Sequence, residues 1–215
     1  MAMSRITALK TGKRNDKRVN MYLDGKFAAS VDTEVALKKG LKIGQELAED
    51  QLKELAEDVS IARCLNIAYR FLSYRPRSEA EMRERLGRRG IEEPKIKIII
   101  NKLKEQHLLD DTAFAQFWKE NRDTFKPRSQ RLTRIELKRK GVADEIIKEV
   151  TDDSNDMDTA YQAAAKKAQH LPKDDYEVFR RRLGDFLLRR GFGYSVINQT
   201  VKKLWQETKE LSDIN

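Results

Sequence analysis

The sequence of 215 residues has few of the residues that build most catalytic and metal sites. It holds one cysteine and two histidines, and these are not grouped with each other or with acidic residues at metal-ligand spacings. The single cysteine, Cys64, excludes an internal disulfide and lies between apolar positions, so we expect it to be buried. No glycine-rich phosphate loop is visible either. We therefore expect no catalytic residues, no cofactor and no metal.

Proline and glycine are also scarce, at four and ten residues, and long apolar runs are missing. The scarcity of both residues leaves long stretches that are compatible with helix. The longest apolar run, Ile96–Ile100, contains Lys97 and is far too short to span a bilayer. No apolar stretch follows a basic leader near the first residue. We therefore expect a cytoplasmic protein that makes no membrane contact.

Charged residues are abundant, at 37% of the chain against 39% apolar residues. This balance is typical of a helical protein with a modest core and a large solvated surface. Lysine and arginine number 44 against 35 acidic residues, which gives a formal charge of +9. An excess of positive charge favours an acidic partner, either nucleic acid or an acidic protein surface.

Residues 1–48 contain short β-prone runs. Ile6–Leu9 and Val19–Leu23 predict two strands, and the Asp24-Gly25 pair predicts a tight turn into a returning strand over Lys26–Val31. We predict a small β-hairpin or three-stranded meander. Such a sheet is marginally stable alone, so it should pack against a helix.

From about Asp50 onward the sequence is helical and contains an internal repeat. Tyr74–Ile91 opens with aromatic-basic-Pro-Arg-Ser and closes with Arg-Arg-Gly-Ile. Phe125–Val142 repeats both ends at an offset of 51 (129 − 78 and 141 − 90), and Arg189–Phe192 repeats the ending 50 residues later (191 − 141). A leucine lies four residues before each glycine. A period near fifty leaves room for three helices per copy and predicts three tandem modules.

The predicted fold is mainly α-helical: an elongated, curved array of three tandem three-helix modules of helix-turn-helix type behind a small N-terminal β-hairpin or meander. The third copy departs from the pattern, because His170–Asp175 stands where the others have Pro-Arg-Ser. The acidic cluster Asp152–Asp158 fits a linker and a helix start better than a metal site. The expected domains are the β-containing extension at 1–48 and helical modules at 49–108, 109–153 and 154–215.

Basic side chains at helical spacing are the candidates for binding a partner. Arg131, Arg134 and Lys138 lie at i, i+3 and i+7 and share one helix face, and the segment 119–140 holds only three acidic residues. The alternative is a solvated surface with internal ion pairs, which is stronger around Arg83, where glutamates alternate with arginines. The full candidate set for binding is Arg75, Arg77, Arg83, Arg88, Arg89, Arg122, Lys126, Arg128, Arg131, Arg134, Lys138, Arg139, Lys140, Arg181, Arg182, Arg189 and Arg190.

Aromatic residues are interpreted as core rather than as base-stacking platforms. Phe114 and Trp118 lie at helical spacing, and Trp205 follows apolar residues at the same spacing. Tyr74 and Phe125 each precede a basic residue and a proline. We expect both rings to pack against the preceding helix rather than to contact a partner.

Several of these segments together resemble the RecX family, the bacterial regulators of the RecA recombinase. The resemblance rests on the motifs of Tyr74–Leu86, Arg88–Ile91, Leu109–Ala115 with Trp118 and Arg122, and Glu136–Val142. It covers roughly residues 50–205, and the N-terminal strands are similar to the extension that many members carry. The third module is the least similar part.

The resemblance implies a regulatory protein rather than an enzyme. Members of the family bind RecA filaments on single-stranded DNA, lie in the helical groove, and limit filament growth or promote disassembly, so that ATPase, recombinase and co-protease activities fall. By this resemblance the expected partners are RecA, its nucleoprotein filament and, weakly, single- and double-stranded DNA, with the chain itself a monomer. A RecA-independent, sequence-tolerant DNA-binding protein is the main alternative, and a scaffold for another protein is a further one.

Overall fold

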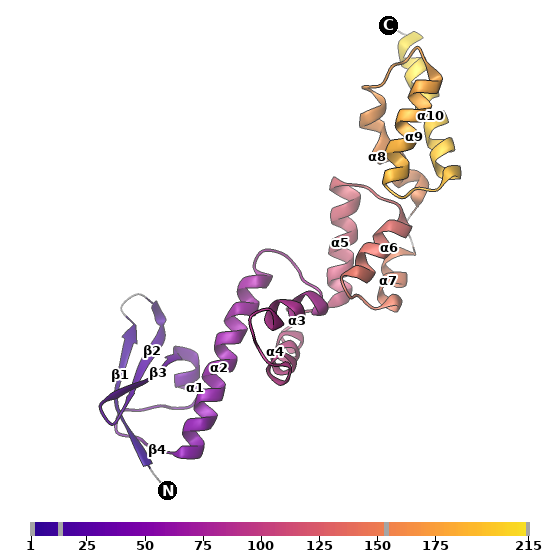
Figure 1. Cartoon of the computed structure of the whole chain (residues 1–215). Helices are drawn as coiled ribbons and strands as arrows, with labels where there is room; N and C mark the ends of the chain where they lie inside the picture. Colours follow the sequence, from indigo (N-terminus) through magenta and orange to yellow (C-terminus); the bar gives the residue numbers. More distant parts are fainter. Residues whose placement is uncertain (1–2, 13–14, 153–154, 214–215) are drawn as a thin grey trace. The chain divides into compact units, whose positions relative to one another are not determined.

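The structure is a computed structural model, and it describes residues 3–12, 15–152 and 155–213. Over these residues the chain forms four strands and ten helices (Figure 1). The mainly α-helical class with a small N-terminal sheet is confirmed. Two compact units are present: one comprises the chain up to Arg75 together with Arg85–Leu103, and the other comprises Pro76–Glu84 and the chain from Lys104 onward.

A four-stranded antiparallel sheet opens the first unit. Asp24 and Gly25 have φ angles of 48° and 79°, the left-handed conformation of a two-residue hairpin turn, which confirms the predicted hairpin. A short fourth strand pairs with the first and extends the predicted meander. In the spatial order β3-β2-β1-β4, the sheet contains β1 (Met3–Gly12), β2 (Asn15–Leu23), β3 (Lys26–Asp32) and β4 (Glu46–Ala48).

Helices cover this sheet and complete the first unit. The short helix α1 (Thr33–Lys38) begins at Asp32, whose carboxylate accepts the Glu34 N–H at 3.2 Å. Helix α2 (Glu49–Leu72) follows β4 directly, and α4 (Glu93–Glu105) lies later in the chain. The sheet, α1 and α2 share a core, as expected for a sheet that is unstable alone. Its buried members are Ile6, Met21, Val31, Ala36, Leu47 and Leu55.

Two three-helix groups make up most of the second unit, and we call them the second and third modules. The second module has a small core around Phe114 and Leu137. The third has a larger core around Phe179, Leu183 and Leu187. The helices are α5 (Asp111–Phe125), α6 (Gln130–Arg139) and α7 (Asp144–Thr151), then α8 (Asp156–Ala168), α9 (Tyr176–Arg189) and α10 (Tyr194–Asp213).

The helix that carries each repeated motif ends in the same way. These helices are α3 (Glu79–Gly87), α6 and α9. The glycine after each has a φ of 75°, 76° or 86°. The N–H of the following residue bonds to the carbonyl five positions back, as in Val142 to Leu137 at 3.2 Å. This is the Schellman arrangement, in which a left-handed glycine satisfies the last carbonyls. The three repeated leucines are fully buried, which confirms the predicted repeat: Leu86, Leu137 and Leu187.

The opening turn of the first repeat packs on the closing glycine of the second, and we call this contact the first joint. Ser78 is fully buried, and its hydroxyl donates to the Lys140 carbonyl at 2.6 Å. The same hydroxyl accepts the Glu81 N–H at 3.2 Å and so caps α3. A Cβ added to Gly141 would lie 2.3 Å from the Ala80 Cβ. The close approach therefore requires glycine here.

The second joint repeats this arrangement one module later. Ser129 is also fully buried, and its N–H donates to the Arg190 carbonyl at 3.0 Å. The Arg190 guanidinium donates to the Pro127 carbonyl at 2.8 Å. A Cβ on Gly191 would lie 2.7 Å from the Ser129 hydroxyl and 2.9 Å from the Leu132 Cβ. The Pro-Arg-Ser turn of one copy and the glycine of the next thus form a matched pair.

Candidate functional site

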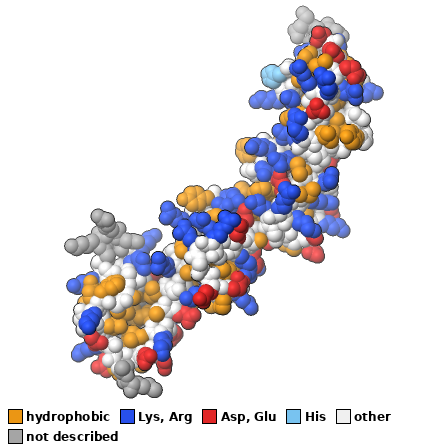
Figure 2. Space-filling model, in the orientation of Figure 1, with side chains coloured by type: hydrophobic (Ala, Val, Ile, Leu, Met, Phe, Trp, Pro, Cys, Tyr) orange, Lys and Arg blue, Asp and Glu red, His pale blue; other side chains and the backbone are white. Residues whose placement is uncertain are grey.

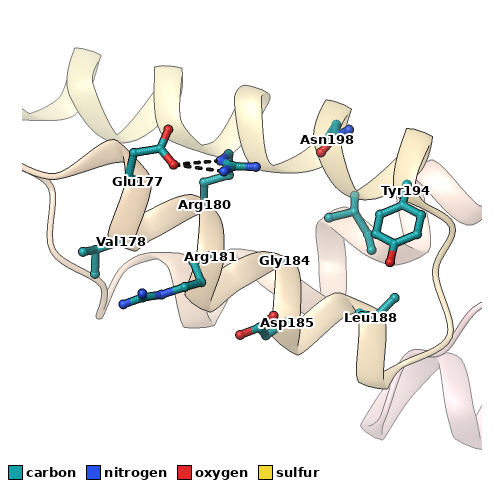
Figure 3. A pocket seen from close by; sticks show the side chains of 10 residues that line it. Glu177, Val178, Arg180, Arg181, Gly184, Asp185, Leu188, Tyr194 and Asn198 are labelled. Atoms are coloured by element: carbon teal, nitrogen blue, oxygen red, sulfur yellow. Dashed lines mark hydrogen bonds and ion pairs between the residues drawn. The ribbon is translucent and has the colours of Figure 1, made fainter.

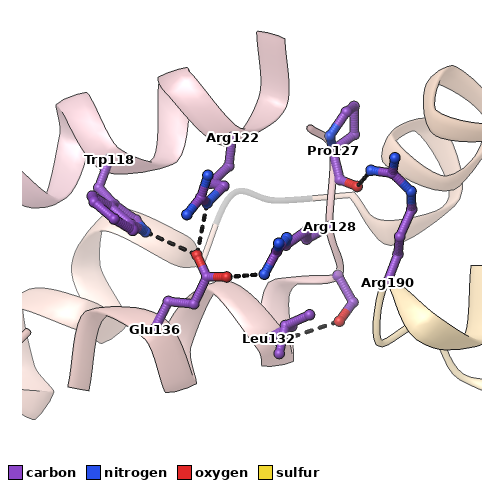
Figure 4. A network of polar contacts seen from close by, with 8 residues as sticks. Trp118, Arg122, Pro127, Arg128, Leu132, Glu136 and Arg190 are labelled. Carbon is purple, nitrogen blue, oxygen red and sulfur yellow. Dashed lines mark hydrogen bonds and ion pairs between the residues drawn. The ribbon is translucent and has the colours of Figure 1, made fainter. Parts of the chain in front are cut away.

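Several of the predicted binding residues are engaged inside the second module. The Glu136 carboxylate is only 13% exposed and accepts hydrogen bonds from three donors (Figure 4). These donors are Trp118 Nε1 at 3.0 Å, Arg122 Nε at 2.7 Å and the Arg128 guanidinium. The Arg122 guanidinium also lies 4.6 Å from the Trp118 ring centroid. This network ties α5, the turn before α6, and α6 together, so Arg122 and Arg128 have structural partners.

The predicted basic stripe on α6 is partly neutralised by acidic residues. Arg134 donates through Nε to Thr151 Oγ1 at 2.7 Å, and its terminal nitrogen lies 2.9 Å from Asp152. Lys138 lies 3.0 Å from the Asp144 carboxylate. Both of these ion pairs are solvent-exposed, so each contributes little to stability and leaves its cation accessible to a partner.

Lys140 and Arg190 belong to the two joints. The Lys140 ammonium contacts Glu81 at 2.6 Å and lies over the Trp118 ring. Burial lowers the pKa of the Arg190 guanidinium from its ordinary value, and the nearby Arg128 charge lowers it further. Glu81 and Asp144, which lie outside the segment 119–140, therefore supply partners that a count of the acidic residues within the segment does not reveal.

The candidates in the first repeat divide between paired and exposed positions. Arg83 donates to Glu79 at 2.8 Å, as the alternating charges of this helix predicted. Arg75 and Arg77 are half-buried on either side of Pro76, and Arg88 is exposed.

The remaining predicted cations are exposed, and they form no ion pair or side-chain hydrogen bond within the part of the chain that the structure describes. Figure 2 shows Lys and Arg side chains over the drawn face of the helical modules. Unpaired surface cations are free to meet phosphate or carboxylate groups without breaking a contact first. We call them the free cation set: Arg89, Lys126, Arg131, Arg139, Arg181, Arg182 and Arg189.

The expectation for Tyr74 and Phe125 is wrong. Their side chains are 72% and 73% exposed, so neither ring packs into a core. Phe125 is the last residue of α5 and Tyr74 follows the end of α2, so each ring lies at a helix end two residues before a proline. Phe125 lies beside the free cation Lys126. By contrast Phe114 is fully buried, as predicted.

Metal-ligating clusters and membrane-spanning helices are absent from the described residues. No group of three or more His, Cys, Asp or Glu side chains among them could hold a metal ion. None of the helices described is long and apolar enough to cross a membrane. Cys64 is buried, as predicted, and unpaired.

The fold and surface define a basic helical-repeat protein with an N-terminal sheet. Four domain families match consecutive stretches of it: the regulatory protein RecX N-terminal domain at 4–48, and the first, second and third three-helix domains of RecX at 64–103, 110–150 and 154–201. The chain belongs to the RecX family.

Relatives and solved structures agree with this assignment. The regulatory protein RecX of Clostridium botulinum (strain Alaska E43 / Type E3) is 32% identical over 206 residues, which cover 94% of this chain and 96% of that protein. That of Clostridium perfringens (strain 13 / Type A) is 31% identical over 207 residues, or 94% and 97%. A crystal structure of regulatory protein RecX, 24% identical, has the same fold, with a TM-score of 0.70 over 92% of this chain and 98% of the other.

Proposed function

We propose that this chain binds RecA and RecA filaments on single-stranded DNA and mainly inhibits them. It would do so by limiting filament extension or promoting disassembly, so that recombinase, ATPase and co-protease activities fall. The observation that carries the proposal is the match of the whole domain series to proteins named regulatory protein RecX. On this proposal the chain acts in the cytoplasm as a monomer and performs no catalysis of its own.

The free cation set supports binding to a nucleoprotein filament. Such a filament presents DNA phosphates and the acidic side chains of its protein. Exposed, unpaired cations can neutralise phosphates or carboxylates without first breaking an ion pair within the chain. Arg131 and Arg139 lie on α6 and Arg181, Arg182 and Arg189 lie on α9. The same helix of two successive modules would therefore supply contacts.

A DNA-binding protein that acts without RecA is the second candidate, and the exposed Phe125 favours it. A ring that is 73% exposed next to Lys126 could stack on an unpaired base while the ammonium meets a phosphate. The two candidates differ in what the chain prefers, bare DNA or the coated filament.

A direct binding comparison distinguishes the two candidates. The labelled chain is titrated with RecA alone, with RecA bound to a poly-dT oligonucleotide, and with the bare oligonucleotide, and fluorescence anisotropy is measured. The proposal predicts tighter binding to RecA and to the coated oligonucleotide than to bare DNA. Equal affinity for coated and bare DNA, without affinity for RecA alone, would establish the second candidate instead.

A further inference from the structure

A surface groove of about 330 Å³ runs between α9 and α10 of the third module (Figure 3). Its apolar lining comes from Val178 and Leu188 on α9 and from Tyr194 and Ile197 on α10. Leu188 is 45% exposed and Tyr194 is 73% exposed, so both present apolar surface to solvent. Gly184 forms part of the wall between them.

The second module has the equivalent groove between α6 and α7, but its chemistry differs. Adding 50 to the positions that line it gives positions that line the α9–α10 groove, so the two are related by the repeat. In the second module Lys138 and Asp144 form an ion pair across the rim at 3.0 Å. Leu188 and Tyr194 occupy those two positions in the third module.

The glycine in the wall is a second difference. Arg134 of the second module corresponds to Gly184, and its side chain is held by Thr151 and Asp152. A glycine inside a helix costs up to about 1 kcal/mol relative to alanine. A Cβ on Gly184 would meet Ile197 at 3.6 Å, an ordinary contact, so no neighbour in the fold demands glycine here. Its absent side chain leaves the apolar wall uncovered.

The charges along the groove carry both signs. Glu177 and Arg180 pair with each other at 2.9 Å. Arg181 and Asp185 have no ion pair with any residue that the structure describes. Carboxylates beside the groove disfavour a polyanion such as DNA, because like charges repel at short range. A protein segment, which can offer an acidic and a basic side chain together, complements both.

We infer that the α9–α10 groove binds a segment of a RecA subunit. A bulky apolar side chain of the segment lies between Leu188 and Tyr194, a neighbouring carboxylate meets Arg181, and a neighbouring cation meets Asp185. Helix-lined grooves bind amphipathic segments in this way, with one or two buried anchors dominating the affinity. The inference rests on the proposed function, since the partner it names is the recombinase subunit.

The test restores the chemistry of the second module in the third. The double variant Leu188→Lys with Tyr194→Asp creates the rim ion pair, and both side chains are exposed enough for the fold to persist. The matched control is Gln162→Lys on α8 with Gln169→Asp at its C-cap, two exposed positions that receive the same added charges. Both full-length variants are compared with the wild type for binding to RecA alone and to bare poly-dT, and circular dichroism checks their helical content.

Loss of the anchor should weaken binding to RecA by about tenfold or more in the double variant and leave the control unchanged. Binding to bare poly-dT should be the same in all three proteins. Unchanged RecA affinity in the double variant would overturn the inference and leave the proposed function standing. A loss confined to poly-dT would show that the groove binds nucleic acid instead. Absence of RecA binding by the wild type would overturn the proposed function and this inference together.

Discussion

Two glycines that follow α6 and α9 allow neighbouring repeats to pack closely because they have no side chain. Gly141 and Gly191 have positive φ angles and lie against the opening turn of the preceding repeat. Gly90 has the same φ, but a Cβ there would have nothing within 4 Å. The repeat therefore uses glycine for backbone conformation in all three copies and for close packing in two.

Alanine substitution separates these two requirements. Gly90→Ala should destabilise the fold by about 1–2 kcal/mol, the cost of a left-handed alanine. Gly141→Ala should cost at least about 1–3 kcal/mol more, because its Cβ overlaps the Ala80 side chain. Urea unfolding followed by circular dichroism measures both. Equal losses in the two variants would contradict the close approach at the first joint.

The tertiary partners of the cations in the second module explain why its surface could not be predicted from charge counts. Lys140 meets Glu81 across 59 positions, and Arg134 meets Asp152 across 18. Such pairs depend on tertiary packing, which spacing along one helix does not contain. The buried leucines could be predicted, because helical periodicity alone determines them.

Removing the Glu136 carboxylate should lower the free energy of unfolding. Glu136→Ala leaves Trp118 Nε1 and two partly buried guanidiniums, those of Arg122 and Arg128, without their acceptor. We expect a loss of about 2–4 kcal/mol in unfolding free energy, read from Trp fluorescence in urea. The exposed Glu120 of the same region offers the control, and Glu120→Ala should change stability by less than about 0.5 kcal/mol. Similar effects in both variants would show that the network contributes nothing.

At the scale of elements, the sequence predicted the hairpin and the repeat, but not how the repeats meet. The Pro-Arg-Ser turn and the closing glycine were visible as separate motifs. Their pairing explains why the third copy keeps its glycine and lacks the turn: only the first two turns pack on a following glycine. The three-residue strand β4 was missed because so short a segment has no periodicity.

The contribution of Glu79, in the first turn of α3, to the free energy of unfolding should depend on pH. Burial alone would raise the pKa of the Glu79 carboxyl, but hydrogen bonds from Lys104 and Arg83 outweigh burial and lower it below the ordinary value of 4.5. A lowered pKa contributes stability that is present above the ordinary value and is lost as the pH falls through the lowered one.

Glu79→Gln should therefore reduce stability at neutral pH and flatten the loss of stability in acid. The difference in unfolding free energy between wild type and Glu79→Gln, measured by urea titration at a series of pH values, should shrink as the pH falls below about 4.5. A difference that is independent of pH would mean that Lys104 and Arg83 do not stabilise the ionised carboxyl.

At the scale of the whole molecule, the sequence predicted a basic binding surface, and the structure divides its members into engaged and free cations. Net charge could not distinguish them. The α9–α10 groove was not predicted, although the sequence contains a signal for it: Leu188 and Tyr194 stand where the preceding repeat has the ion-paired Lys138 and Asp144. Comparing the repeats position by position would have revealed it.

Reversing three free cations tests their role. The variant Lys126→Glu, Arg131→Glu and Arg139→Glu should keep its helical content and bind RecA-coated DNA at least about tenfold more weakly, with a smaller dependence on salt. The matched control reverses three exposed lysines of the first unit, Lys26, Lys42 and Lys97. An equal loss in the control would mean that binding follows net charge and not this surface.

The most direct test of the central claim is the ATPase activity of RecA on single-stranded DNA, measured while this protein is titrated in. The account predicts that hydrolysis falls at or below one molecule per RecA subunit. Unchanged ATPase activity at a stoichiometric amount, with the protein shown to be folded, would contradict the account.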